Sequence, residues 1–339
     1  MVNDIVLDDL PDEVRESLAA RQRLRDELQA ANPGFEFVVS DVDAWGPDAV
    51  LRVAFLGGDT ALLTDIESTL RDIQQICSVR FQLRDAQGAF LRWTASDTDY
   101  RGQIRVSFDR SGYWSLVGRD SVDPAVSNQQ GIGGGPNERS LNLGGFDASR
   151  PISWRGTVLH EFLHALGFHH EHQNVTGPCQ GDFRWEDDPG YVPTKTAAGS
   201  YTVDPQGRRP GIYTYLSGPP NKWNRPKVDH NLRADPDADL RYGPFDRASV
   251  MLYRFDPLFY GSAQSTCRPD GDGQRLSAGD VTALRSLYPS SPAAMAALDI
   301  RKRDLVARLE ALEPAGGLEA AVSRPDWVGR VRASMSPPM

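Results

Sequence analysis

The sequence predicts an α+β protein whose first half is α/β-like and whose second half is irregular. Before residue 150, short β-rich runs alternate with a strongly amphipathic helical segment, the pattern of a sheet with helices packed on it. A further helical segment begins the stretch His160–His172, which contains five of the chain's six histidines. Beyond Gly177 the chain is rich in Pro, Gly, Asp and Arg and has little periodicity, which is typical of loops.

Composition limits the classes of function. With 339 residues the chain can form one large domain or two, and it is long enough to be an enzyme by itself. Its 37 basic and 46 acidic residues give a formal charge of -9 without any basic run, so we expect no nucleic-acid partner. No apolar run reaches membrane-spanning length, and the acidic first ten residues do not resemble a Sec signal peptide. The compartment and the oligomeric state stay open.

Residues 1–48 are expected to be a helical segment that precedes the main domain. Apolar residues recur at helical spacing from Asp12 to Ala31, and the Asn-Pro-Gly that follows ends this helix. A short strand is predicted at Phe35–Val39. The segment either packs on the domain or is a prosegment that is removed on activation.

A β-α-β unit is predicted at the start of the main domain. Ala49–Phe55 is β-rich, a helix capped by Asp59 or Thr60 runs to about Ile76, and Val79–Leu83 returns as a strand. Two strands joined in this way are expected to be parallel with a right-handed crossover. Gln103–Asp109 alternates apolar and polar residues and is the third predicted strand.

Two more strands are predicted on either side of the glycine-rich loop Gly131–Gly135, namely Tyr113–Gly118 and Arg139–Leu143. After the histidine-rich helix and the irregular region, Val281–Leu287 is expected to be helical.

The end of the chain is predicted to be helical. A linker at Ser290–Pro292 leads to two Ala- and Arg-rich segments, Ala293–Leu312 and Leu318–Ala333. We therefore expect a main domain at 49–290, with an upper half to about residue 170 and a lower half from about 171, followed by a C-terminal helical tail at 291–339.

A segment of thirteen residues, HEFLHALGFHHEH, begins at His160 and has the spacing of a metal site. His160 and His164 are four residues apart, so on a helix their imidazoles can reach one ion. Gly167 allows the helix to end, and His170 can then return as a third ligand. Three neutral imidazoles and one open position indicate catalytic zinc, with Glu161 as the base for a water molecule.

Two simpler interpretations compete with the zinc site. The segment could be a histidine-rich surface tract that stores metal, or an amphipathic helix whose apolar face packs in a core. Neither needs Glu161, Gly167 and His170 at these offsets, so we prefer a catalytic site. His169 and His172 are expected to be surface or supporting imidazoles.

A second motif, Ser249-Val250-Met251-Leu252-Tyr253, follows about eighty residues later. A Met in an apolar pentapeptide is usually core, but after H-E-x-x-H-x-x-G-x-x-H it becomes a Met-turn candidate. Together the motifs resemble those of the metzincin metallopeptidases and, within them, the astacin family. The astacin pattern H-E-x-x-H-x-x-G-F-x-H-E is filled at every defined position, and weaker similarity extends over about residues 49–290.

This resemblance implies a metzincin zincin fold. Such a fold has a twisted, mostly parallel five-stranded sheet with one antiparallel edge strand, an active-site helix and an irregular lower subdomain. An extended polypeptide substrate would bind along the edge strand, residues 113–118.

The resemblance also implies roles for single residues. The zinc ligands would be His160, His164 and His170, with Tyr253 as an additional, switchable ligand that stabilises the oxyanion. Glu161 would be the general base. Met251 would lie beneath the metal, and Gly167 and Glu171 would support the site.

The sequence also departs from the family pattern. Leu252 replaces a Met-turn histidine that is not a ligand. Glu171 could bind a matured N-terminus only after upstream cleavage, and it otherwise pairs with an arginine. The family's disulfides do not map: Cys77 is expected to be a buried thiol, and Cys179 and Cys267, whose spacing leaves pairing open, would form a different bridge.

Three acidic residues admit a metal-related interpretation. Asp59 is comparable to the aspartate with which family propeptides block zinc, but its position favours a helix cap. Asp270 and Asp272 suggest calcium, but the rest of a calcium loop is missing, so a turn is preferred.

We therefore predict a zinc-dependent endopeptidase, a metalloendopeptidase in which Glu161 activates a zinc-bound water. The alternative is a zinc-binding module that does not cleave or a latent zymogen, with the N-terminal or C-terminal helices covering the site.

Overall fold

The computed structural model describes residues 10–31, 43–234, 243–311, 328–332 and 335. They belong to two compact units. We call the described residues within 10–168 and 280–335 the sheet unit, and those within 169–279 the disulfide unit. The predicted strand Phe35–Val39 and most of the predicted helix Leu318–Ala333 lie outside the described residues.

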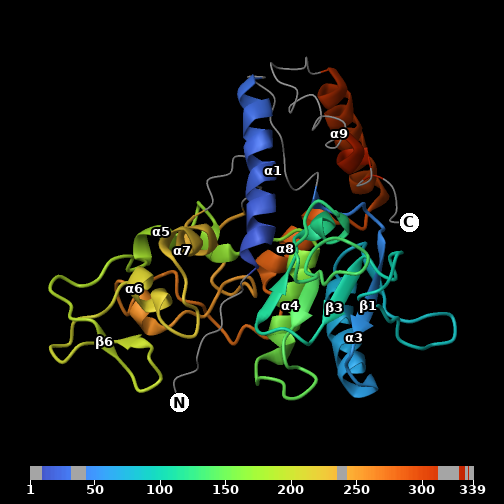
Figure 1. The fold of residues 1–339 in the computed structure, drawn as a ribbon. Coiled ribbons are helices and arrows are strands. Elements are labelled where there is room, and N and C mark those ends of the chain that lie inside the picture. The colour runs from blue at the N-terminus through green and yellow to red at the C-terminus, as the bar shows by residue number, and fades with distance from the viewer. Residues whose placement is uncertain (1–9, 32–42, 235–242, 312–327, 333–334, 336–339) are drawn as a thin grey trace. The chain divides into compact units, whose positions relative to one another are not determined.

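The sheet unit contains a five-stranded mixed sheet (Figure 1). In spatial order its strands are β2 (Arg80–Gln82), β1 (Val50–Leu56), β3 (Ile104–Ser107), β5 (Leu141–Leu143) and β4 (Tyr113–Ser115). All neighbours are parallel except β4, which is antiparallel to β5 with Trp114 opposite Asn142. The expected mostly parallel sheet with one antiparallel edge strand is therefore confirmed. The edge strand is shorter than predicted because Gly118 begins a 3₁₀ turn, η1 (Gly118–Val122).

Helix α3 (Thr60–Gln74) connects the parallel strands β1 and β2, as the β-α-β pattern predicted. The carboxylate of Asp59 accepts a hydrogen bond of 2.8 Å from the backbone N–H of Leu62, so this residue is a helix cap. One face of the helix is buried and consists of Leu62, Leu63, Ile66, Thr69, Leu70 and Ile73. The cap and the apolar face together explain why the sequence predicted this helix closely.

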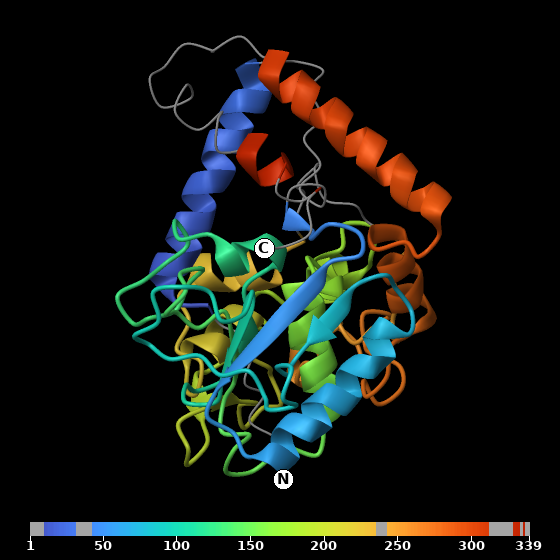
Figure 2. The same ribbon diagram turned by 90° about the vertical axis from the view of Figure 1, so that its right-hand side faces the viewer.

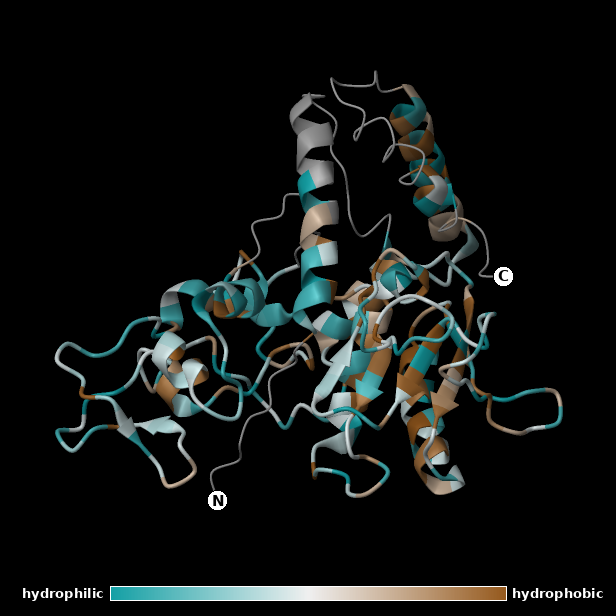
Figure 3. Ribbon diagram, viewed as in Figure 1, coloured by the Kyte–Doolittle hydropathy of each residue, from teal (hydrophilic) through white to brown (hydrophobic). Residues whose placement is uncertain are grey.

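Helix α4 (Trp154–Ala165) packs against α3 beside the sheet (Figure 2). Arg155 forms an ion pair of 2.5 Å with Asp72 of α3, and the ring of Phe162 meets that of Phe81 at a centroid distance of 5.5 Å. Figure 3 shows apolar residues concentrated in the strands and in α4. Most of α4 is buried, so its side chains are held in fixed positions.

Two aromatic residues that are far apart in the sequence, Trp45 and Tyr288, bind the C-terminal end of α4. The indole N–H of Trp45 donates to the carbonyl of Ala165 at 2.8 Å, and the hydroxyl of Tyr288 donates to that of Leu166 at 2.6 Å. These carbonyls have no partner within the helix, so the two bonds satisfy them. Burial raises the pKa of Tyr288, which keeps its hydroxyl protonated as a donor.

Helix α1 (Asp12–Ala31) has the predicted bounds and is attached through its first turns. Val14 is fully buried in an apolar cluster that includes Trp114 of β4, and Leu10 and Leu18 pack against it. The other members of this cluster are Leu116, Val126 and Ile132. The start of α1 therefore covers apolar side chains of the edge strand.

Two further helices end the sheet unit, α8 (Ala278–Leu287) and α9 (Pro292–Ala311). Because α9 begins at Pro292, the predicted linker is shorter than expected. Residues 328–332 are helical, and Val328 and Val331 pack with α9 in an apolar cluster. Among the described residues, no helix has the length and apolar composition needed to cross a membrane.

The disulfide unit consists of short elements. They are η2 (Glu171–Gln173), α5 (Cys179–Asp182), β6 (Thr194–Lys195), β7 (Tyr201–Thr202), α6 (Ile212–Ser217), α7 (Arg225–Leu232) and η3 (Pro257–Phe259). The sequence predicted only irregular structure here and missed α6 and α7, which are too short to show periodicity. Their buried residues join an apolar cluster with Phe183, Phe255 and both bridged cysteines.

Arg330 joins the C-terminal segment to two distant parts of the sheet unit. Its guanidinium group lies 2.5 Å from the carboxylate of Asp43 and 2.9 Å from that of Asp120, and it also pairs with Asp123. The side chain is only 8% exposed. Burial alone would lower the pKa of Arg330, but the three carboxylates raise it above its usual value.

Replacing Arg330 with Met is expected to lower the free energy of unfolding by about 3–5 kcal/mol, because buried carboxylates lose their counter-charge. Denaturant unfolding measures this change. Arg332→Met is the control, since Arg332 pairs with Glu310 at the surface, and its effect should stay below about 1 kcal/mol. Equal effects of the two substitutions would contradict the importance of the buried cluster.

Candidate metal centre

Helix α4 presents two buried imidazoles on one face. His160 and His164 are one turn apart, and their Nε2 atoms are separated by 3.1 Å. Two nitrogens that bind one tetrahedral zinc ion at about 2.0–2.1 Å would be roughly 3.3 Å apart. The spacing therefore suits a shared ion.

The chain turns directly after α4 and brings a third imidazole to the first two. Gly167 has a φ of +96°, which other residues rarely adopt, and it ends the helix as the sequence predicted. The ligand nitrogens of His160, His164 and His170 all lie within 4.8 Å of one another. Among the described residues, this triad is the group of histidine, cysteine or acidic side chains that could hold a metal ion.

Hydrogen bonds at the Nδ1 atoms orient two of these rings. His164 Nδ1 lies 2.6 Å from the carbonyl oxygen of Phe168, and His170 Nδ1 lies 3.3 Å from Oε1 of Gln173. Both partners accept hydrogen bonds, so each Nδ1 carries the proton and each Nε2 keeps its lone pair. Neutral imidazoles held in this way by outer partners are typical of zinc ligands. The triad is therefore suited to a zinc ion.

Glu161 is 2% exposed and lies beside the first histidine on α4. Helix α4 packs against β4, and the pKa of Tyr113 in β4 is raised, first by burial of the phenol and then by the negative charge of Glu161. The carboxylate thus lies near β4, where an extended peptide was expected to bind.

The segment Ser249–Tyr253, the Met-turn candidate, is linked to the chain that follows His170. The backbone N–H of Glu171 donates to the carbonyl of Met251 at 3.0 Å. The carboxylate of Glu171 accepts hydrogen bonds from the N–H of Asp246 at 2.9 Å and from Asn174 at 3.1 Å. Met251 is buried, and its own N–H donates to the hydroxyl of Ser249. Glu171 therefore holds two segments of the disulfide unit together.

Two aromatic rings lie beside that of the third histidine. The centroid of Tyr253 lies 4.4 Å from that of His170 and 5.0 Å from that of His172. His170 and His172 are themselves stacked at 5.0 Å. His172 is 1% exposed, so it is a supporting imidazole and not a surface residue. The sequence offered both interpretations and could not choose between them.

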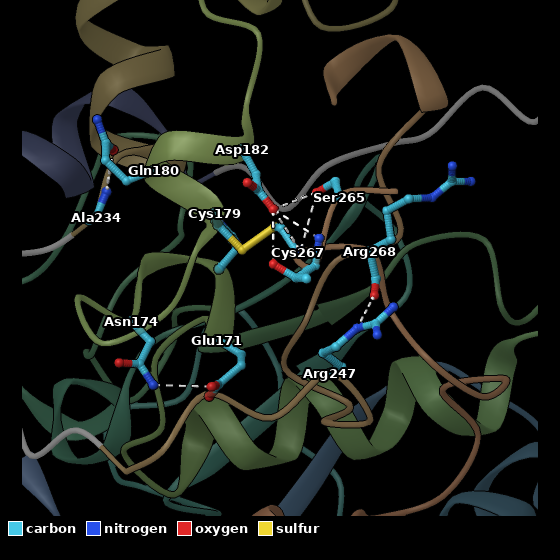
Figure 4. The surroundings of a disulfide bond; sticks show 12 residues. Glu171, Asn174, Cys179, Gln180, Asp182, Ala234, Arg247, Ser265, Cys267 and Arg268 are labelled. Atoms are coloured by element: carbon cyan, nitrogen blue, oxygen red, sulfur yellow. Dashed lines mark hydrogen bonds between the residues drawn. A yellow bond between two sulfur atoms is a disulfide. The ribbon is translucent and has the colours of Figure 1, made fainter. Parts of the chain in front are cut away.

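A disulfide joins Cys179 and Cys267, which are 88 residues apart in the sequence (Figure 4). The carboxylate of Asp182 accepts hydrogen bonds from the hydroxyl of Ser265 at 2.9 Å and from the N–H of Thr266 at 2.9 Å. Burial would raise the pKa of Asp182, but these hydrogen bonds lower it. The bridge and the ionised carboxylate together fix the chain from Ser265 to Cys267.

Other candidate residues lie elsewhere. Cys77 is a buried free thiol whose pKa burial raises. Asp270 pairs with Arg247, and Asp272 accepts a hydrogen bond from the N–H of Gln274 in a turn. Neither aspartate belongs to a metal-capable group among the described residues, so nothing supports a calcium site there.

No protein-family model matches the chain. A structure of myroilysin is similar over 74% of this chain and 97% of its own, with 25% sequence identity and a TM-score of 0.50. A second structure of myroilysin covers 73% of this chain and 86% of its own, with 22% identity and a TM-score of 0.42. A structure of high choriolytic enzyme 1 (HCE-1), a hatching enzyme zinc-protease from Oryzias latipes (medaka fish), is similar over 72% of this chain and 92% of its own. The sequence identity is 16% and the TM-score is 0.39.

The first of these similarities extends over nearly the whole of that myroilysin chain. Together with the five-stranded sheet, its antiparallel edge strand and the histidine-bearing helix α4, it shows that the chain has a metzincin-like fold.

Proposed function

We propose that the chain is a zinc-dependent endopeptidase. The observation that carries this proposal is the convergence of His160, His164 and His170, whose ligand nitrogens lie within 4.8 Å of one another. Three neutral imidazoles leave one position of a tetrahedral ion open, which is the arrangement of catalytic zinc. Glu161, adjacent to the first ligand and near the edge strand, supplies the carboxylate that peptide hydrolysis needs.

The proposed chemistry is hydrolysis of an internal peptide bond. A bound zinc ion supplies a Lewis acid that polarises the scissile carbonyl and lowers the pKa of a water molecule. Glu161 accepts a proton from the attacking water and then gives it to the leaving amine. Tyr253, whose ring lies beside that of His170, is proposed as an additional ligand and as a hydrogen-bond donor to the oxyanion.

We propose that the substrate is an extended polypeptide that adds to β4. This strand is the last in the sheet, so one of its edges has no neighbouring strand in the described sheet. Edge strands bind extended peptides through backbone hydrogen bonds, and side-chain pockets then give specificity. Because helix α4, which carries Glu161, packs against β4, a peptide at this edge would lie close to the proposed base.

Replacing Glu161 with Gln is expected to lower peptide hydrolysis by at least about 100-fold, because the amide cannot accept the proton. Zinc content should stay at one ion per chain, since the three imidazoles are unchanged. Cleavage of a peptide library, followed by mass spectrometry, measures the first quantity, and metal analysis measures the second. Glu67→Gln, which changes a carboxylate paired with Arg84, is the matched control. Unchanged turnover in Glu161→Gln would refute the assignment of the base.

A latent form of the same enzyme is favoured by one observation. The start of α1 covers apolar side chains of β4, the proposed substrate strand. We propose that residues before Asp43 form a removable prosegment. Asp43 itself pairs with Arg330, and Trp45 binds the end of α4, so both residues are proposed to stay with the catalytic domain.

A specific protease site inserted between Ala31 and Asp43 tests this latency in the folded chain. Casein hydrolysis, measured with and without a chelator, is expected to rise after cleavage because α1 can then leave the edge strand. Equal hydrolysis before and after cleavage would contradict latency. A chain that binds zinc but hydrolyses nothing in either form would favour a zinc-binding module that does not cleave.

A further inference from the structure

The side chain of Gln173 connects the third histidine to helix α7. Its Oε1 atom lies 3.3 Å from His170 Nδ1. Its Nε2 atom donates to the carbonyl of His230 at 2.9 Å and approaches that of Arg233 at 3.4 Å. One amide thus contacts a proposed ligand and the C-terminal end of a helix.

The chemistry of these partners fixes the orientation of the amide. Backbone carbonyls only accept hydrogen bonds, so the NH₂ group of Gln173 must face His230 and Arg233. The amide oxygen then faces His170, and only a protonated Nδ1 can donate to it. The lone pair of His170 is therefore placed on Nε2, where a metal ion would bind.

Helix α7, which Gln173 contacts, is itself fixed by a helix cap and by buried apolar residues. Asn224 caps its start by accepting a hydrogen bond of 2.9 Å from the N–H of Lys227, and Val228 and Leu232 are buried in the apolar cluster of the disulfide unit. Its last carbonyls have no partner within the helix and are available to side chains.

A second side chain uses the same helix end. His172 Nε2 lies 2.8 Å from the carbonyl oxygen of Asn231 and donates to it. The turn η2 is therefore attached to α7 at two points, through His172 and through Gln173. His170 is the N-cap of this turn and Gln173 is its last residue, and the two side chains meet at 3.3 Å.

The three histidines differ in how the fold holds them. His160 and His164 project from a buried helix, and the carbonyl of Phe168 fixes the second ring. His170 instead directly precedes a turn of three residues, and the rings of His172 and Tyr253 lie beside its imidazole. Gln173 binds the Nδ1 of His170 as the carbonyl of Phe168 binds that of His164.

We propose that Gln173 is a positioning residue for the zinc ligand His170: it sets the imidazole tautomer and links the ring to α7. This inference rests on the proposed zinc function and extends it to a residue outside the zinc and Met-turn motifs.

Three variants of the full-length chain separate positioning from a general structural role. Gln173→Met keeps the length of the side chain and removes both polar contacts. Gln173→Glu keeps an oxygen that accepts from His170 Nδ1 but turns a carboxylate toward two carbonyls. Gln180→Met is the matched control, because the Oε1 of Gln180 accepts a hydrogen bond from the N–H of Ala234, close to α7 (Figure 4).

Zinc affinity, measured by competition with a chelator, and the visible spectrum of the cobalt(II)-substituted chain are the two readouts. Gln173→Met should bind zinc about 10-fold to 100-fold more weakly and shift the cobalt spectrum. Gln180→Met should match the wild-type chain in both. Gln173→Glu should bind zinc more tightly than Gln173→Met, because its carboxylate still accepts from His170 Nδ1. If Gln173 had a purely structural role, Gln173→Glu would bind zinc no more tightly than Gln173→Met.

The outcomes distinguish this inference from the function on which it rests. If Gln173→Met had the zinc affinity and the cobalt(II) spectrum of the wild-type chain, the positioning role would be refuted. The proposed zinc site would not be affected by that result. Gln173→Glu no better than Gln173→Met would also overturn the positioning role. If the wild-type chain bound no zinc, both the proposed function and the positioning role of Gln173 would be refuted.

Discussion

The end of helix α4 is the constraint on which the rest of the site depends. Two imidazoles must project from a rigid helix, and the helix must then stop so that a third can return. Gly167 makes the turn with a positive φ, and its Cα would lie 3.4 Å from a Cβ placed on Gly118. Trp45 and Tyr288 bind the last carbonyls of α4, so segments more than 240 residues apart in the sequence fix one helix end.

The third imidazole is held by different means. His170 directly precedes a short turn whose side chains bind the C-terminal carbonyls of α7, and Glu171 links the same turn to the segment before Met251. The ring of His172 stacks on that of His170, and the ring of Tyr253 lies tilted beside it. The Cys179–Cys267 bridge belongs to the same unit and limits the freedom of its short elements. The region without sequence periodicity is therefore ordered by side-chain contacts.

Sequence reasoning succeeded where local signals agree. The helix after Asp59 has a cap and an apolar stripe, and the spacing of His160 and His164 depends on helix geometry alone. It failed for α6 and α7, whose six and eight residues are too few to show a period. The burial of His172 depends on rings that come from Tyr253 and Phe255. Likewise, no local signal joins Arg330 to Asp43, because only the fold brings them together.

X-ray absorption at the zinc K-edge would show whether the three imidazoles hold one zinc ion. With one zinc ion bound per chain, we expect light-atom ligands at about 2.0–2.1 Å and outer-shell scattering from three imidazole rings. Sulfur at about 2.3 Å, or scattering from fewer than three imidazoles, would contradict a zinc site built from the three histidines.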